Sequence, residues 1–151
     1  MAAISSILFT LSAGDHIIVS KHVYGGTFRV LEDILPHWGI THDFVDFSDL
    51  DAIETAIKPE TKVLYIETPS NPVLNITDIR AVVKIAKKHQ LLTIADNTFL
   101  SPFLQNPLDL GVDIVVHSAT KFLAGHSDIL AGAVVVNDKK LADKIYFIQN
   151  A

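Results

Sequence analysis

The chain has 151 residues, of which 49% are hydrophobic and 19% charged, and its formal net charge is −5. This length can bury the core of one domain, and no uncharged apolar run is long enough to cross a membrane. The dispersed charges form no basic stripe for nucleic acid, and a chain without cysteine has neither disulfides nor thiolate metal sites. We therefore expect a soluble protein of the reducing cytoplasm, without a nucleic-acid or membrane partner.

Apolar segments rich in β-branched residues alternate with helical segments along the chain. This pattern is typical of βαβ units and predicts an α/β fold with a mainly parallel sheet flanked by helices. Several segments are apolar throughout, as expected for strands that helices cover on both faces. The expected strands are residues 16–20, 42–47, 62–67, 91–97, 114–118 and 132–137.

Helices are expected between these strands. The first should span residues 2–12 and end before Gly14, while Pro36 should end the second. Ser48 resembles the start of another helix, and Thr77 is expected to cap the one that follows it. No internal repeat or linker is visible, so the chain is expected to form a single domain.

Four polar residues follow different expected strands: Tyr24, Asn71, Asp96 and Lys121. Each has a structural explanation by itself, as an amphipathic core edge, a turn former, a loop cap and a solvent-facing lysine. In open parallel sheets, however, ligands bind at the carboxyl ends of the strands. The joint placement of the four residues at this edge favours a binding site.

Lys121 follows a buried strand and precedes a loop that contains Gly125. A lysine at the end of such a strand is expected to be partly desolvated, which favours the neutral amine. A neutral amine can attack an aldehyde and form a Schiff base, and Ser118 and Thr120 beside it can hold a phosphate. We expect the chemistry of the chain to take place here.

Four further motifs accompany the segment around Lys121: MAAISS at 1–6, YGGT at 24–27, ETPSNP at 67–72 and ADNT at 95–98. In this order they resemble the Cys/Met-metabolism (trans-sulfuration) family of pyridoxal-phosphate-dependent enzymes. That family includes cystathionine β- and γ-lyases, cystathionine γ-synthases and methionine γ-lyase. The resemblance covers nearly the whole chain and implies part of the large domain of a fold-type I, aspartate aminotransferase-like PLP-dependent transferase fold.

The resemblance also implies roles for single residues. Lys121 would hold the cofactor as a Schiff base and act as the general base, and Tyr24 would stack on the ring and assist proton movements. Asp96 would keep the pyridine nitrogen protonated. The remaining cofactor-binding positions implied are Met1 at the start of the first helix, Asn71 near the ring hydroxyl, Thr98, and Ser118 and Thr120 at the phosphate.

By the same resemblance, residues 1–151 form one partial cofactor-binding domain, without the N-terminal arm and the C-terminal small domain of the family. The parent protein is expected to be a carbon–sulfur lyase that eliminates sulfur from cystathionine at the β- or γ-carbon, as a cytoplasmic homotetramer built from dimers. Cystathionine γ-synthase, another homocysteine-forming γ-replacement, or methionine γ-lyase activity remains an alternative. The chain by itself is expected to be inactive.

Three other interpretations compete with this one. Ser118 and Lys121 match the S-x-x-K of serine acyl-transfer enzymes, but no K-T-G element accompanies them. His117 and His126 match no helical metal motif, and no metal site is expected. A non-catalytic binding or assembly fragment would associate through uncovered apolar surface. The presence of both Asp96 and Lys121 counts against this last interpretation.

Overall fold

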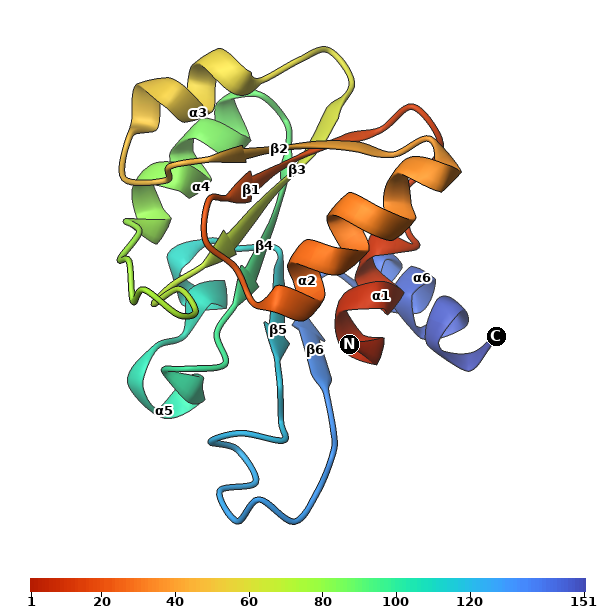
Figure 1. Cartoon of the computed structure of the whole chain (residues 1–151), viewed down its shortest axis with the longest axis vertical. Coiled ribbons are helices and arrows are strands. Elements are labelled where there is room, and N and C mark those ends of the chain that lie inside the picture. The colour runs from red at the N-terminus through yellow and green to blue at the C-terminus, as the bar shows by residue number, and fades with distance from the viewer.

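A computed structural model describes the whole chain, residues 1–151. Its centre is a six-stranded sheet with the order β2-β1-β3-β4-β5-β6, in which only β6 runs antiparallel to its neighbour (Figure 1). The strands are β1 (His16–Ser20), β2 (Thr41–Val45), β3 (Thr61–Glu67), β4 (Leu92–Asp96), β5 (Ile114–His117) and β6 (Ala133–Val136). The expected mainly parallel α/β fold is confirmed, and each strand lies within two residues of its expected bounds.

Helices precede the first strand, follow the last strand and occupy four connections between strands. They are α1 (Ala2–Leu8), α2 (Gly25–Arg29), α3 (Leu50–Ala56), α4 (Ile79–Lys88), α5 (Ser101–Leu104) and α6 (Lys139–Asn150). A π-helical turn (Val30–Ile34) and a 3-10 turn (Leu35–Trp38) prolong α2, and a second 3-10 turn spans Pro107–Leu110. None of these helices has the length and apolar character needed to span a membrane.

Three helix boundaries differ from those expected. Helix α1 ends at Leu8, before residue 12, because Thr10 donates its backbone N–H and its hydroxyl to the Ile7 carbonyl and tightens the chain into a turn. Asp49 caps α3 in place of Ser48, whose own hydroxyl donates to Asp46. Asp78 caps α4 in place of Thr77. In both helices a carboxylate accepts the free N–H of the first turn.

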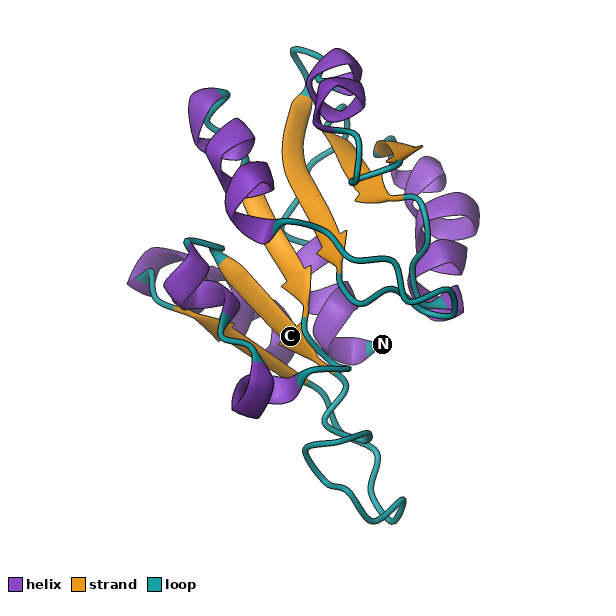
Figure 2. Ribbon diagram, turned by 90° about the vertical axis from the view of Figure 1, so that its left-hand side faces the viewer, coloured by secondary structure: helices purple, strands orange, loops and turns teal.

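Two apolar cores lie on the opposite faces of the sheet. Helices α1 and α6 and the turns after α2 cover one face, and α3 and α4 cover the other (Figures 1 and 2). All five residues of β1 are buried, which explains the apolar run Ile17–Val19 at its centre.

The carboxyl ends of β1, β3, β4 and β5 meet at one edge of the sheet, because these strands are parallel. Residues 118–132 connect β5 to β6 and project beyond this edge as a long loop, the blue excursion at the bottom of Figure 1. The four polar residues singled out in the sequence all lie at this edge: Asp96 ends β4, and Tyr24, Asn71 and Lys121 lie in the connections that leave β1, β3 and β5.

Candidate active site

A cavity of about 1220 Å³ lies at the carboxyl edge of the sheet. Connections after four different strands and the start of α1 contribute to its wall. The wall includes every residue that the sequence predicted for the site: Met1, Tyr24, Asn71, Asp96, Thr98, Ser118, Thr120 and Lys121. Cofactor and drug-sized ligands occupy pockets of about 300–1,000 Å³. The cavity is therefore large enough for a cofactor and a small substrate together.

Asp96 ends β4 and is only 8% exposed. Its Oδ1 accepts hydrogen bonds from the Thr98 backbone N–H at 3.0 Å and the Thr98 hydroxyl at 2.5 Å. The Thr98 hydroxyl oxygen in turn accepts from the Ser118 N–H at 2.8 Å, which links the ends of β4 and β5. Burial raises the pKa of the Asp96 carboxyl, while the bonds from Thr98 and the nearby His117 oppose this rise. Because no lysine or arginine pairs with it, the carboxylate can receive a cationic ligand group.

Tyr24 occupies the N-cap position of α2, and its side chain is 45% exposed toward the cavity. The absence of a side chain at Gly26 makes this position possible. A Cβ at Gly26 would overlap the Tyr24 ring and would come 2.6 Å from the Met1 sulfur. Gly26 therefore lets the start of α1 and the tyrosine ring form one continuous wall of the cavity.

Lys121 is exposed, so the prediction that it is partly desolvated is wrong for this chain. The reason is that β5 ends at His117, and the following turn carries the lysine beyond the packed edge of the sheet. The turn is nevertheless held in place. Thr120 donates its N–H and its hydroxyl to the Ala131 carbonyl, each at 3.1 Å, and its hydroxyl oxygen accepts the Ala131 N–H at 2.9 Å.

The sequence did not identify Glu67, the last residue of β3, as part of the site. This residue is 5% exposed, and its carboxylate accepts the Tyr24 N–H and the Asn71 N–H, both at 2.8 Å. Burial is the largest cause that raises the pKa of Glu67 to about 7, and the charge of Asp96 adds to it. An acidic residue directly after the apolar run of β3 was the available signal. Two aromatic residues, Phe99 and Phe122, also line the cavity, with ring centroids 6.5 Å apart.

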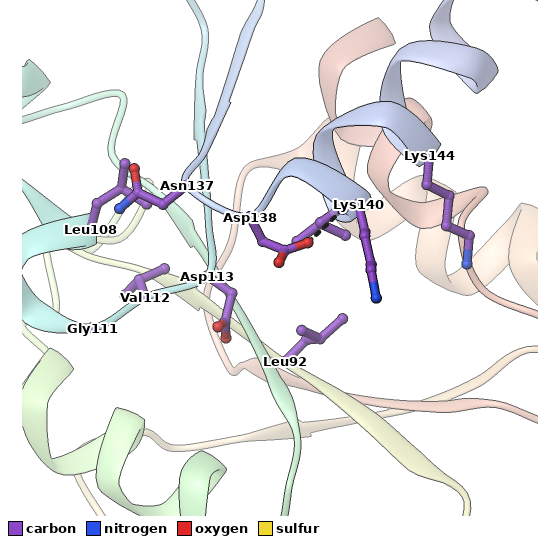
Figure 3. A pocket seen from close by; sticks show the side chains of 10 residues that line it. Leu92, Leu108, Gly111, Val112, Asp113, Asn137, Asp138, Lys140 and Lys144 are labelled. Atoms are coloured by element: carbon purple, nitrogen blue, oxygen red, sulfur yellow. Dashed lines mark hydrogen bonds between the residues drawn. The ribbon is translucent and has the colours of Figure 1, made fainter.

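A second hollow of about 670 Å³ lies at the opposite edge of the sheet (Figure 3). Three of its polar side chains are engaged in holding the fold. Asp138 caps α6 by accepting the Leu141 N–H, Lys144 donates to the Thr10 carbonyl, and Asp113 accepts from Thr93. The carboxyl edge, where the predicted residues gather, is therefore the candidate active site.

Known proteins resemble the chain along its whole length. The family model described as Cys/Met metabolism PLP-dependent enzyme matches residues 1–151. Cystathionine β-lyase MetC of Bacillus subtilis is 58% identical over the whole chain, and cystathionine γ-lyase of the same organism is 50% identical. The chain spans 39% and 40% of these two relatives.

A solved structure is equally similar. It is a cystathionine γ-lyase from Lactobacillus plantarum complexed with L-serine, at a TM-score of 0.97 and 56% identity, and the match covers 99% of this chain and 39% of that one. The family match, the identities and the shared fold agree with the resemblance found in the motifs. The chain belongs to the Cys/Met-metabolism family of enzymes, whose cofactor is pyridoxal 5′-phosphate.

Proposed function

We propose that the chain forms part of the cofactor domain of a carbon–sulfur lyase of sulfur amino-acid metabolism, which acts on cystathionine by β- or γ-elimination. The observation that carries this proposal is the convergence of Asp96, a buried carboxylate without a cationic partner, and Lys121, a primary amine, on one cavity. An acid for a ring nitrogen and an amine for an aldehyde are the two groups that pyridoxal phosphate requires of a protein.

The residues around the cavity fit this cofactor. When bound, it supplies an aldehyde that reacts with amines and a pyridinium ring that accepts electrons from the substrate. Asp96 would hold the proton on the ring nitrogen. Burial raises the pKa of this carboxyl, and a cationic ring N–H beside it would favour the charged carboxylate. Thr98 would act through its two bonds to Asp96. Asn71 would face the ring hydroxyl, and Met1, Ser118 and Thr120 the phosphate.

Lys121 and Tyr24 would carry out the proton transfers. The Lys121 amine would bind the cofactor aldehyde covalently and, once free, would take the α-proton of the amino-acid substrate. The partly exposed Tyr24 would lie against the ring, with its hydroxyl available for proton transfer near the amine. The hydrogen bonds between Thr120 and Ala131 would fix the turn from which Lys121 reaches the substrate.

The sulfur substrate and the bond that is broken belong to this proposal. Relatives named cystathionine β-lyase, cystathionine γ-lyase and cystathionine γ-synthase/O-acetylhomoserine (thiol)-lyase are 58%, 50% and 49% identical to the chain. We favour elimination because the more similar relatives are lyases. The complete enzyme would be a cytoplasmic homotetramer, with an N-terminal arm and a small domain outside residues 1–151.

The first test is labelling of the chain by its cofactor. Purified chain is incubated with pyridoxal phosphate, its visible absorption spectrum is recorded, and borohydride reduction is followed by peptide mass spectrometry. The proposal predicts an absorption band and a label on Lys121, both lost in Lys121→Ala. Lys140→Ala, which changes an exposed lysine of the opposite hollow, should retain both. A label spread over the surface lysines would contradict the assignment.

The second test asks for activity. Residues 1–151 replace the matching segment of Bacillus subtilis cystathionine β-lyase MetC, with which they are 58% identical. β-Elimination converts cystathionine and water into homocysteine, pyruvate and ammonia, whereas γ-elimination gives cysteine, 2-oxobutyrate and ammonia. The keto acid therefore identifies the bond broken. A folded chimera that binds the cofactor and forms neither keto acid would refute the proposed function.

A further inference from the structure

Glu67 joins two loops that are distant in the sequence. Its Oε2 accepts the backbone N–H of Tyr24, 43 residues earlier, and its Oε1 accepts that of Asn71, four residues later. Each bond is 2.8 Å long, a distance typical of a charge-assisted hydrogen bond. One carboxylate thus receives one N–H from each of two loops that form the cavity wall.

The position of Glu67 itself is fixed by the sheet. Its backbone N–H donates to the Ser20 hydroxyl oxygen at 3.2 Å, and this hydroxyl donates to the Tyr65 carbonyl at 3.3 Å. Glu67 is also in register with Asp96 on the neighbouring strand. The carboxylate therefore stands at the end of a central strand of the sheet, between the ends of β1 and β4.

Burial by itself makes an acidic residue at position 67 unfavourable. The carboxylate is almost fully buried, and no lysine, arginine or histidine pairs with it. The titratable side chains that act on it are Asp96 from β4 and Tyr65 from its own strand, and both are acids. A glutamine of the same shape would avoid the cost of a buried charge, but its amide offers only one acceptor oxygen. Two acceptor oxygens are what this position requires.

We propose that Glu67 is a positioning residue that couples the Tyr24 loop to the Asn71 loop and sets the spacing of the two side chains across the cofactor site. This inference rests on the proposed function, in which Tyr24 stacks on the cofactor ring and Asn71 faces the ring hydroxyl. Glu67 lines the cavity, and in this positioning role it acts through the backbone N–H groups of Tyr24 and Asn71. Loss of either bond would let the two walls of the site move independently.

Hydrogen exchange of the chain without cofactor tests the coupling directly. In Glu67→Gln, the amide N–H groups of Tyr24 and Asn71 compete for one oxygen, so exchange should accelerate by at least about tenfold for one or both. Amides of the sheet interior should keep their relative protection. Asp113→Asn is the matched control, because Asp113 also accepts two hydrogen bonds, from the N–H and hydroxyl of Thr93, but at the opposite edge. It should leave both loop amides unchanged.

A second measurement uses the unmodified chain and so does not depend on the folding of a variant. The amide proton shifts of Tyr24 and Asn71 should follow one shared titration when Glu67 is protonated, because a neutral acid has only one good acceptor oxygen. Separate midpoints for the two amides, or unchanged exchange of both in a folded Glu67→Gln, would overturn the proposal. A uniform acceleration at all amides would overturn it as well, since that marks global destabilisation.

A cofactor titration separates this inference from the proposed function. If the unmodified chain binds pyridoxal phosphate, Glu67→Gln should weaken binding by about tenfold, while Asp113→Asn should not change it. If the unmodified chain and the chimera both fail to bind, the proposed function fails, and the amide measurements still decide whether Glu67 couples the loops. Equal affinity of the unmodified chain and Glu67→Gln would refute the positioning role.

Discussion

At the scale of single residues, Gly25 and Gly26 are neighbours in α2, but the packing around them requires a glycine only at position 26. A Cβ at Gly26 would overlap the Tyr24 ring and the Met1 sulfur, whereas a Cβ at Gly25 would meet only the Arg29 guanidinium at 3.7 Å. Gly26→Ala should therefore destabilise the chain by about 1–3 kcal/mol, as other overpacked sites do. Gly25→Ala should be neutral or stabilising by up to about 1 kcal/mol, because alanine favours the helix. Urea unfolding of the two variants measures the difference, and equal stabilities would contradict the packing.

Glu67 should make stability depend on pH. Its pKa is about 7 in the folded chain, mainly because of burial, against 4.5 for an ordinary glutamate. A raised pKa means that the folded chain binds the proton more tightly, so this contribution to stability is full below pH 4.5 and is lost as pH rises through 7. Its size is on the order of 3 kcal/mol.

The comparison that isolates this contribution is between the unmodified chain and Glu67→Gln. The free energy of unfolding of the unmodified chain should fall relative to that of the variant between pH 4.5 and 7, and the difference should then stay constant. Glu60→Gln, at an exposed glutamate, should follow the unmodified chain throughout. Parallel pH profiles for the chain and Glu67→Gln would show that Glu67 ionises normally.

At the scale of elements, Thr120 has a structural role in addition to the one proposed for it at the phosphate. The hydroxyl predicted to bind phosphate already donates to and accepts from Ala131, which closes the base of the loop over residues 118–132. Thr120→Val keeps the shape and removes both bonds, so proteolysis within the loop should accelerate by about tenfold. Ser127→Ala, at an exposed hydroxyl without a partner in the chain, is the control. If phosphate affinity falls while proteolysis is unchanged, the hydroxyl acts on the ligand alone.

The sequence predicted the strands well because buried parallel strands are continuous apolar segments, and β1 was located without error. It failed at helix ends, where several polar residues compete for the same N–H groups. Ser48 and Thr77 are sound caps by type, but Asp49 and Asp78 stand one residue later and have the geometry to bond. The residues that the sequence predicted for the site all line one cavity in the structure.

The sequence could not predict contacts between residues that are distant from each other in the chain. Glu67 lies in a recognised motif, yet its link to Tyr24 depends on the spacing of β1 and β3 and on a loop 43 residues away. The exposure of Lys121 likewise follows from where β5 ends in space. Sequence patterns identify residue types at an edge of a sheet, whereas the partners of each side chain follow only from the packed structure.

At the scale of the whole molecule, the surface of the chain is larger than expected for its mass. The accessible area is 8337 Å² for 16.5 kDa, against about 7,600 Å² for a compact monomer of this mass. Part of this surface is aromatic: Tyr146 and Phe147 on α6 are 67% and 74% exposed. Adjacent aromatic side chains on one helix mark a surface that gains free energy when it is covered.

The chain by itself should therefore associate, and α6 should contribute to the contact. Sedimentation velocity over a dilution series should show species heavier than the monomer, and the double change of Tyr146→Ser and Phe147→Ser should shift the distribution toward the monomer. Lys140→Ser, an exposed change on the same helix that removes no apolar area, should leave it unaltered. If the unmodified chain remains monomeric at every concentration, the exposed aromatic residues do not drive association. If the double variant associates as strongly as the unmodified chain, the contact lies elsewhere, and the loop with Leu130, which is 93% exposed, is the next surface to change.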